Sequence, residues 1–142
     1  MTEVTEQAYQ DLRQHIIDTW KYIELRDELD NPIVRLSPDD QRVSWVHETV
    51  VEEVEELIDY DHRGNPIYET TIVKKLPNTL QLQIVIKGTD ADITLPTTFV
   101  KSVIYNVASD GDPLSEESFT PFDMANDNDQ ITVIHNITVP QL

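Results

Sequence analysis

The chain has 142 residues, of which 27 are acidic and 10 basic, giving a net charge of −17 at pH 7, and it has no cysteine. The length is that of one domain with room for a buried core, and the lack of cysteine excludes disulfides, thiolate zinc sites and a cysteine nucleophile. Because such a surface repels phosphate, we expect no binding to nucleic acid or to anionic membranes.

The acidity has two interpretations, which the sequence leaves open. A solvated acidic surface keeps a protein soluble. Adaptation to very high salt is the other, because screening over about 3 Å at 1 M salt removes the self-repulsion. No apolar run approaches the roughly 18 residues of a membrane helix, and the acidic residues 1–6 do not resemble a secretory signal. We therefore expect a soluble protein without a targeting segment.

Residues 5–20 are predicted to form an N-terminal helix. Neither proline nor glycine interrupts them, and Glu3 and Glu6 lie near the start, where the helix dipole favours negative charge. Apolar side chains recur at spacings of three and four, which places them on one face: Tyr9, Leu12, Ile16, Ile17 and Trp20.

Two turns with the same pattern follow, each predicted to join the strands of a hairpin. Residues 22–26 and 33–36 alternate as strands do, and Asp27 to Pro32 lie between them. The spacing of Asp27, Asn31 and Pro32 returns in Asp61, Asn65 and Pro66, now with Gly64 inside the turn.

Residues 43–58 fit two structures. Their valines and leucine match the stripe of a helix with glutamates outside. We favour a long hairpin with strands over 50–60 and 67–76, because the segment is valine-rich and leads into a strong turn. Such a hairpin places Glu52 and Glu55 near Lys74 and Lys75. These four residues are our candidates for an interface in an arm over residues 43–76.

The remaining sequence is predicted to be β-rich. Residues 80–87 alternate most cleanly, residues 93–95 form a short strand, and residues 99–107 form a buried strand for which a short helix is the alternative. Residues 109–113 form a turn, residues 121–129 a polar loop and residues 131–139 the last strand. The fold class is therefore mainly β with an N-terminal helix: an antiparallel sandwich or barrel-like single domain, 1–142, with an extended hairpin.

No constellation for catalysis or for a cofactor stands out. The four histidines, His15, His47, His62 and His135, lack metal-ligand spacing, and three separated glycines cannot form a phosphate-binding loop. Acidic clusters occur at 110–112 and 123–129, but no twelve-residue calcium loop is present. We expect a protein that is not an enzyme and holds neither a cofactor nor a metal ion.

The large aromatic side chains are expected mostly in the core. Phe119 and Phe122 differ, because we expect them in a loop over residues 118–122, which contains Pro121. Aromatic side chains in such a place are typical of interfaces, so these two residues join the interface candidates.

Residues 99–114, FVKSVIYNVASDGDPL, and residues 129–139, DQITVIHNITV, share a pattern of strands and turns with a known class of proteins. This part of the chain resembles small virion structural proteins of tailed viruses. The resemblance implies a tail, fibre, baseplate or neck protein with a β-sandwich, made in the host cytoplasm and assembled into the virion. With the acidity, a virus of a salt-loving archaeon is one expectation.

Two functions follow as hypotheses. The first is a structural protein that joins copies of itself and other virion proteins through strand edges and an extended arm. The second is a receptor- or carbohydrate-binding β-module on the virion surface, which would use exposed aromatic side chains and loop carboxylates.

Overall fold

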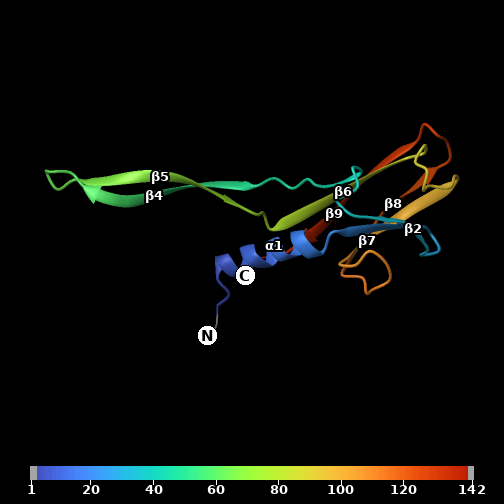
Figure 1. Cartoon of the computed structure of the whole chain (residues 1–142), viewed down its shortest axis with the longest axis horizontal. Helices are drawn as coiled ribbons and strands as arrows, with labels where there is room; N and C mark the ends of the chain where they lie inside the picture. The colour runs from blue at the N-terminus through green and yellow to red at the C-terminus, as the bar shows by residue number, and fades with distance from the viewer. Residues whose placement is uncertain (1–2, 141–142) are drawn as a thin grey trace. The chain divides into compact units, whose positions relative to one another are not determined.

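The computed structural model describes residues 3–140, in which one helix precedes nine strands (Figure 1). The fold is mainly β, with antiparallel sheets, as predicted. Its elements are α1 (Glu6–Thr19), β1 (Tyr22–Arg26), β2 (Pro32–Leu36), β3 (Val43–Trp45), β4 (Val50–Tyr60), β5 (Pro66–Lys75), β6 (Thr79–Lys87), β7 (Thr97–Tyr105), β8 (Ser115–Met124) and β9 (Gln130–Thr138).

The chain divides into two compact units. The body comprises the described residues up to His47 and from Asn78 onward, and the arm comprises Glu48–Pro77. The arm is shorter than the expected 43–76 at its start, because residues 43–45 form β3 and pair with β6 in the body.

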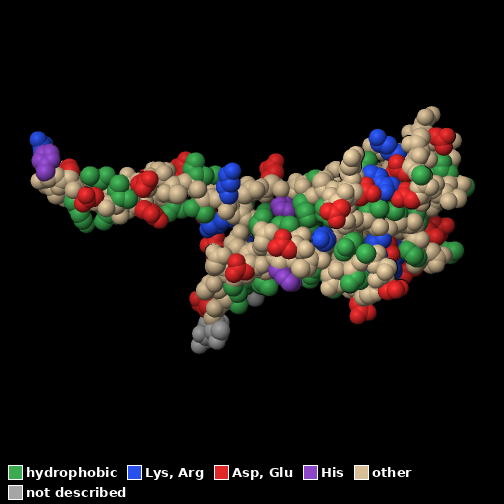
Figure 2. All heavy atoms as spheres, in the orientation of Figure 1, with side chains coloured by type: hydrophobic (Ala, Val, Ile, Leu, Met, Phe, Trp, Pro, Cys, Tyr) green, Lys and Arg blue, Asp and Glu red, His purple; other side chains and the backbone are tan. Residues whose placement is uncertain are grey.

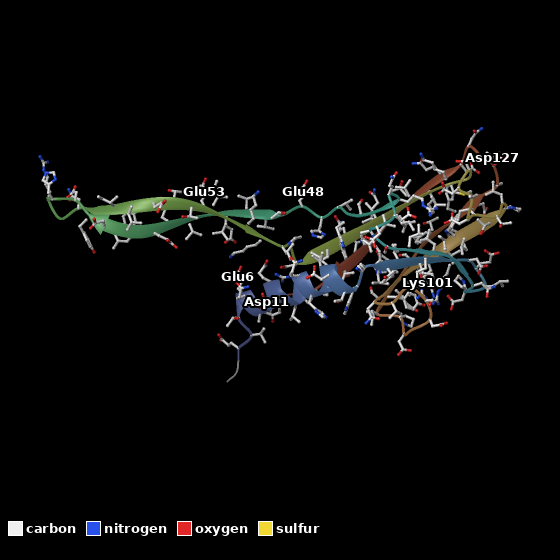
Figure 3. All side chains as sticks on the ribbon, viewed as in Figure 1. Glu6, Asp11, Glu48, Glu53, Lys101 and Asp127 are labelled. Carbon is white, nitrogen blue, oxygen red and sulfur yellow. The ribbon has the colours of Figure 1, made fainter. Side chains whose placement is uncertain are left out.

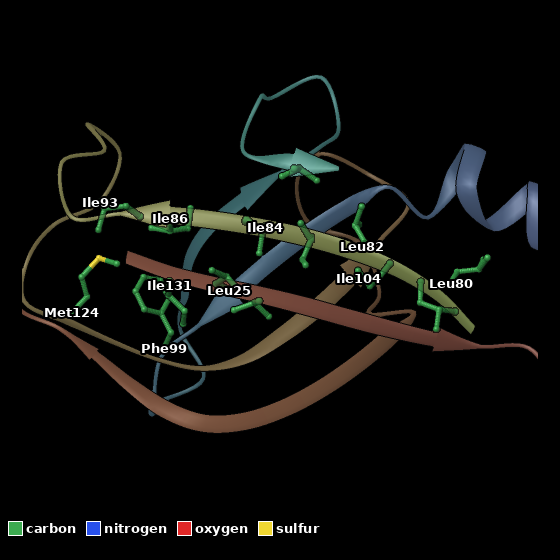
Figure 4. Packing of buried hydrophobic residues seen from close by; sticks show 14 of the residues in the cluster. Leu25, Leu80, Leu82, Ile84, Ile86, Ile93, Phe99, Ile104, Met124 and Ile131 are labelled. Carbon is green, nitrogen blue, oxygen red and sulfur yellow. The ribbon is translucent and has the colours of Figure 1, made fainter. Parts of the chain in front are cut away.

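The body is a β-sandwich of two antiparallel sheets. One sheet has the order β2-β1-β7-β8 and the other the order β3-β6-β9. Along β6, Leu80, Leu82, Ile84 and Ile86 are fully buried while the intervening residues are partly exposed. These side chains meet residues of the facing sheet such as Leu25 and Phe99 (Figure 4). The period-two alternation predicted for residues 80–87 is thus the inner face of the sandwich.

Helix α1 forms because Thr5 caps it, its Oγ1 accepting a hydrogen bond from the Ala8 amide at 3.3 Å. Its buried face differs from the predicted one. Leu12 is 50 % exposed, whereas Arg13 is only 1 % exposed. The Arg13 Nη2 donates to Asn78 Oδ1 and to the Val139 carbonyl, both at 3.0 Å, and its guanidinium lies over the Tyr9 ring. Polar partners at the end of the sandwich therefore draw an arginine inward.

The two predicted turns have the same hydrogen bonds. In the first, Asp27 N–H donates to the Asn31 carbonyl and Asp27 Oδ1 accepts from the Asn31 amide. Asp61 and Asn65 repeat both bonds. The fourth residue has a positive φ in both turns, 63° at Asp30 and 84° at Gly64. One local solution therefore closes both hairpins, as the sequence pattern indicated.

The hairpin prediction for residues 50–76 is confirmed. β4 and β5 pair antiparallel from Val50↔Lys75 to Tyr60↔Pro66, with an irregularity between Leu57 and Asp59. The helical alternative for residues 43–58 is wrong, and so is the helical alternative for residues 99–107, which contain most of β7.

Two other predictions are wrong. Residues 93–95 form no strand, although Ile93 is buried. The predicted loop at 121–129 begins inside β8, so Pro121 lies within a strand. A proline is tolerated there because β8 is at the edge of its sheet. The pairing is also irregular at this point, since Phe99 faces Phe122 and Lys101 faces Ser118.

Candidate functional site: the exposed hairpin arm

The arm has no inner face of its own. Every residue of β4 is exposed, and the hairpin forms a separate two-stranded sheet. Its large apolar side chains that are exposed comprise Val50, Val51, Val54, Leu57, Ile58, Tyr60, Ile67, Tyr68 and Ile72. A single hairpin is marginally stable in water, and apolar groups gathered on a surface mark an interaction site. The arm therefore has the composition of a surface that a partner covers.

Apolar and acidic side chains alternate along both faces of the arm. Cross-strand partners point to the same face, so Glu53 and Ile72 share one face with Leu57 and Tyr68. The opposite face carries Glu52, Val73, Val54 and Thr71 among others. Green and red side chains accordingly intermingle along the hairpin in Figure 2, and Figure 3 shows side chains projecting from both of its faces. A partner that covers only one face would leave apolar groups exposed on the other.

Charge is distributed unevenly between the two strands. β4 carries Glu52, Glu53, Glu55, Glu56 and Asp59 and no basic residue, whereas β5 carries two lysines and a single glutamate. Of the predicted contacts, Lys75 Nζ pairs with Glu52 Oε2 at 2.8 Å. Glu55 lies opposite Thr70 and Lys74 opposite Val51, so these two do not meet.

Like charges also face each other within the arm. Glu56 is the direct cross-strand partner of Glu69. Two carboxylates in this position destabilise a strand pair. A cation close to this part of the arm would therefore stabilise the pairing of β4 with β5.

The remaining interface candidates, Phe119 and Phe122, lie on β8 in the body. Both are partly buried and pack against the core. They line a groove of about 340 Å³ toward β9, in which Ile134 is 42 % exposed. Glu117 also lines this groove. Its carboxylate joins β8 to β9 by accepting hydrogen bonds from the Asn136 amide at 2.8 Å and from Asn136 Nδ2 at 3.0 Å. The structure thus does not join these phenylalanines with the arm candidates in one unit.

A buried ionic network that the sequence did not reveal lies on β1, β2 and β7. The side chain of Glu24 is 5 % exposed and accepts hydrogen bonds from Arg26 Nε at 2.8 Å and Arg35 Nη2 at 3.1 Å. Arg35 also stacks on Tyr105, with its guanidinium carbon 3.5 Å from the ring centre. Its Nη1 donates to the carbonyls of Val107 and Asp110.

This network lines an open pocket of about 510 Å³. Hydrogen bonds within the protein already engage both guanidinium groups. Because Arg35 on β2 donates to the Asp110 carbonyl, the network also fastens the turn at 109–113 to the sheet. Spacing gave no signal for it, because Arg35 and Tyr105 are far apart in the chain.

A second cluster surrounds Arg42. Its Nη1 lies 2.8 Å from Asp92 Oδ1 and 3.3 Å from Asp90 Oδ2, and its Nη2 lies 2.9 Å from Asp40 Oδ2. The hydrogen bonds from Arg42 lower the pKa of Asp40 to about 2. Arg42 thus holds three carboxylates of a strongly acidic chain together.

His135 is a fully buried histidine on β9. Its Nδ1 is 2.7 Å from Ser102 Oγ on β7, and its Nε2 is 2.8 Å from Ser115 Oγ on β8. Burial lowers its pKa, and the nearby Glu117, at 4.0 Å, opposes that shift. The side chain is therefore a neutral bridge between the two sheets.

We expect His135 to make folding stability fall as the pH drops below about 6.5, the ordinary pKa of a histidine. The folded pKa is depressed, so the contribution of His135 is complete above about pH 6.5 and declines as the pH falls toward the folded pKa, by at most about 1.4 kcal/mol per pH unit. Denaturant unfolding at several pH values measures this slope.

Replacing His135 with Gln should reduce the slope, and His47, whose pKa burial also lowers, should account for the part that remains. His15→Gln, on the exposed side of α1, is the matched control. A slope that His135→Gln leaves unchanged would contradict this assignment.

No group of three or more acidic or histidine residues in positions 3–140 is arranged to hold a metal ion. In one of the predicted acidic loops, Asp129 instead accepts hydrogen bonds from the amides of Ala125 and Asn126. These bonds lower its pKa. Within the same described range, no helix is long and apolar enough to cross a bilayer.

Comparison of the chain with protein-family models, with curated proteins and with solved structures finds no match.

Proposed function

We propose that the chain is a non-enzymatic structural protein that assembles in repeated copies through the arm, within the tail, neck or fibre apparatus of a tailed-virus particle. The observation that carries the proposal is the arm itself, a two-stranded ribbon whose nine large apolar side chains are exposed. Burying them against other copies would stabilise each hairpin by roughly 25 cal/mol per Å² of apolar surface covered.

The body supports the same proposal. Its core is built from both sheets of the sandwich and includes no residue of the arm. A unit that folds on its own core can present a second segment for assembly. The likeness of residues 99–114 and 129–139 to virion proteins supports placement in a virus particle, with other virion proteins as further partners.

Assembly should strengthen as salt is added. Each copy carries a charge of −17, so copies repel one another at low ionic strength. Raising the salt from about 0.05 M to 1 M shortens the screening length to about 3 Å and removes most of that repulsion. Light scattering coupled to size exclusion should show a shift from monomer to rings or higher oligomers, reversible on dilution into low salt. A strict monomer at every salt and at high protein concentration would contradict the proposal.

Binding of a carbohydrate or a surface receptor is the second candidate function, favoured by the groove between β8 and β9. Phe119 and Phe122 supply aromatic surface there, and Thr120 and Thr132 supply hydroxyl groups. A glycan array, probed with and without calcium, tests this function, and an array without hits would remove it.

A further inference from the structure

We infer that the arms join head to tail, with the free edge of β5 in one copy pairing antiparallel with the free edge of β4 in the next copy. This inference rests on the proposed function and specifies how the copies meet. The resulting sheet repeats in the order β4-β5-β4-β5 across neighbouring chains.

Edge pairing fits the arm better than docking on a face. Each strand of the arm pairs with only one other strand, so each keeps one edge without a strand neighbour. Both faces carry apolar side chains. A strand added at an edge provides cross-strand neighbours on both faces together, whereas a partner on one face covers only half of the apolar groups.

Charge selects which edges pair. Pairing β4 with β4 of a second copy sets glutamates against glutamates, since four glutamates lie between positions 52 and 56. An antiparallel β5–β5 pair in full register places the lysines of each strand opposite residues 66 and 67 of the other, so it forms no ion pair there. Only β4 against β5 brings opposite net charges together. Opposite charges across a strand pair stabilise it and like charges destabilise it.

A specific register satisfies these charges. If Lys75 faces Glu52 of the next copy, Lys74 faces Glu53 of that copy and Val73 faces its Val54, with each pair on a common face. This register differs by two residues from the pairing within one arm, where Glu52 faces Val73. A two-residue shift keeps every side chain on its own face.

The geometry of such a contact determines the kind of assembly. Two different edges meet, so the contact is heterologous and each copy retains one free edge of each type until the assembly closes. Such contacts produce rings when the rotation closes and filaments when it does not. A two-fold symmetric dimer would instead require β4 with β4 or β5 with β5.

The test uses charge reversal in the full chain. The E52K/E53K variant places lysines on β4 against the lysines of β5, and the K74E/K75E variant places glutamates on β5 against those of β4. We expect each variant alone to assemble at least tenfold more weakly than the unmodified chain at the lowest salt concentration at which the unmodified chain assembles, where screening of the edge charges is weakest. We expect an equimolar mixture of the two to recover assembly, with both chains in the same oligomers by mass spectrometry.

The mixture also guards against misfolding of the arm, because a damaged hairpin would not be rescued by a partner. The matched control is D11K/D18K, which changes the net charge by the same amount as E52K/E53K but on the exposed side of α1. It should assemble at least as well as the unmodified chain.

Three outcomes would overturn the inference. Unimpaired assembly of E52K/E53K would show that the β4 edge is not used. A mixture that stays as weak as its components would show that charge does not select the edges. A discrete dimer of the unmodified chain would show isologous pairing, in which case copies still assemble and only the head-to-tail arrangement fails. A monomeric unmodified chain would instead overturn the proposed function itself.

Discussion

Replacing residues 48–77 with a linker of about four residues should leave a folded body that no longer assembles. The two cut points are adjacent in the body, because Trp45 pairs with Leu82 and the Val46 amide donates to the Gln81 carbonyl at 2.9 Å. A short turn can therefore join them. Shortening the connection also reduces its loop-closure entropy by about 1–2 kcal/mol, so the body should be no less stable than in the full chain.

Light scattering and thermal unfolding monitored by circular dichroism would measure both effects. We expect a monomer at every salt concentration and a melting temperature that does not fall. A body that unfolds without the arm would contradict the division into two units. A body that still forms the same oligomer would contradict assembly through the arm.

A milder variant keeps the hairpin and removes apolar surface. Ile72, Tyr60 and Tyr68 are 62 %, 58 % and 57 % exposed on the arm. Replacing all three with Thr retains β propensity and should weaken assembly without preventing folding. The matched control is Leu29→Thr, since Leu29 is 75 % exposed in the turn between β1 and β2 of the body and should have no effect.

Replacing Glu24 with Ala should produce the largest loss of stability available from one substitution in the ionic network. Glu24 is the shared acceptor of Arg26 and Arg35, whose side chains are only 14 % and 12 % exposed. Without it, Arg26 keeps Asp30, whose side chain is 57 % exposed, as a carboxylate partner, and Arg35 is left with the backbone carbonyls of Val107 and Asp110. Removing one partner of such a buried pair costs about 3–5 kcal/mol, which corresponds to roughly 10–17 °C in melting temperature for a chain of this size.

Denaturant unfolding at low salt, where the chain is expected to be monomeric, would measure the change. Glu24→Gln keeps the size and the acceptor oxygen, so it should lose less than Glu24→Ala. Glu116→Ala is the control, because Glu116 is exposed on β8 and such substitutions usually fall within about 0.5 kcal/mol. A loss no larger than that of the control would show that the network contributes nothing to stability.

Patterns confined to a few consecutive residues predicted local structure well. The Asp–Asn–Pro spacing located both turns, because the bonds that close them join residues no more than four apart. Alternation located β6 and β9, because one side of each strand must be apolar to enter the core. The Val43–Ile58 segment remained ambiguous between helix and strand, because its apolar residues match the periods of both. Only its pairing with a second strand decides between the two structures.

The sequence predicted a contact between candidate site residues where that contact depends only on how the hairpin pairs. Glu52 and Lys75 form an ion pair because a strong turn fixes which strands face each other. Phe119 and Phe122 were expected in a loop, yet they lie on an edge strand. Proline discouraged the strand prediction there, and a sheet edge that tolerates it is visible only once the strand order is known.

The amino-acid sequence by itself determined that this protein is an acidic, cysteine-free, mainly β chain with one helix and a glutamate-rich hairpin, because composition and short-range periodicity encode those features. Tertiary structure decided the rest. It buried Arg13 in place of Leu12, drew β3 into the body, and brought Glu24 to Arg35 and His135 to Ser102. It also showed that no third strand from residues 3–140 pairs with the hairpin. These features depend on contacts between residues distant in the chain, which no local pattern specifies.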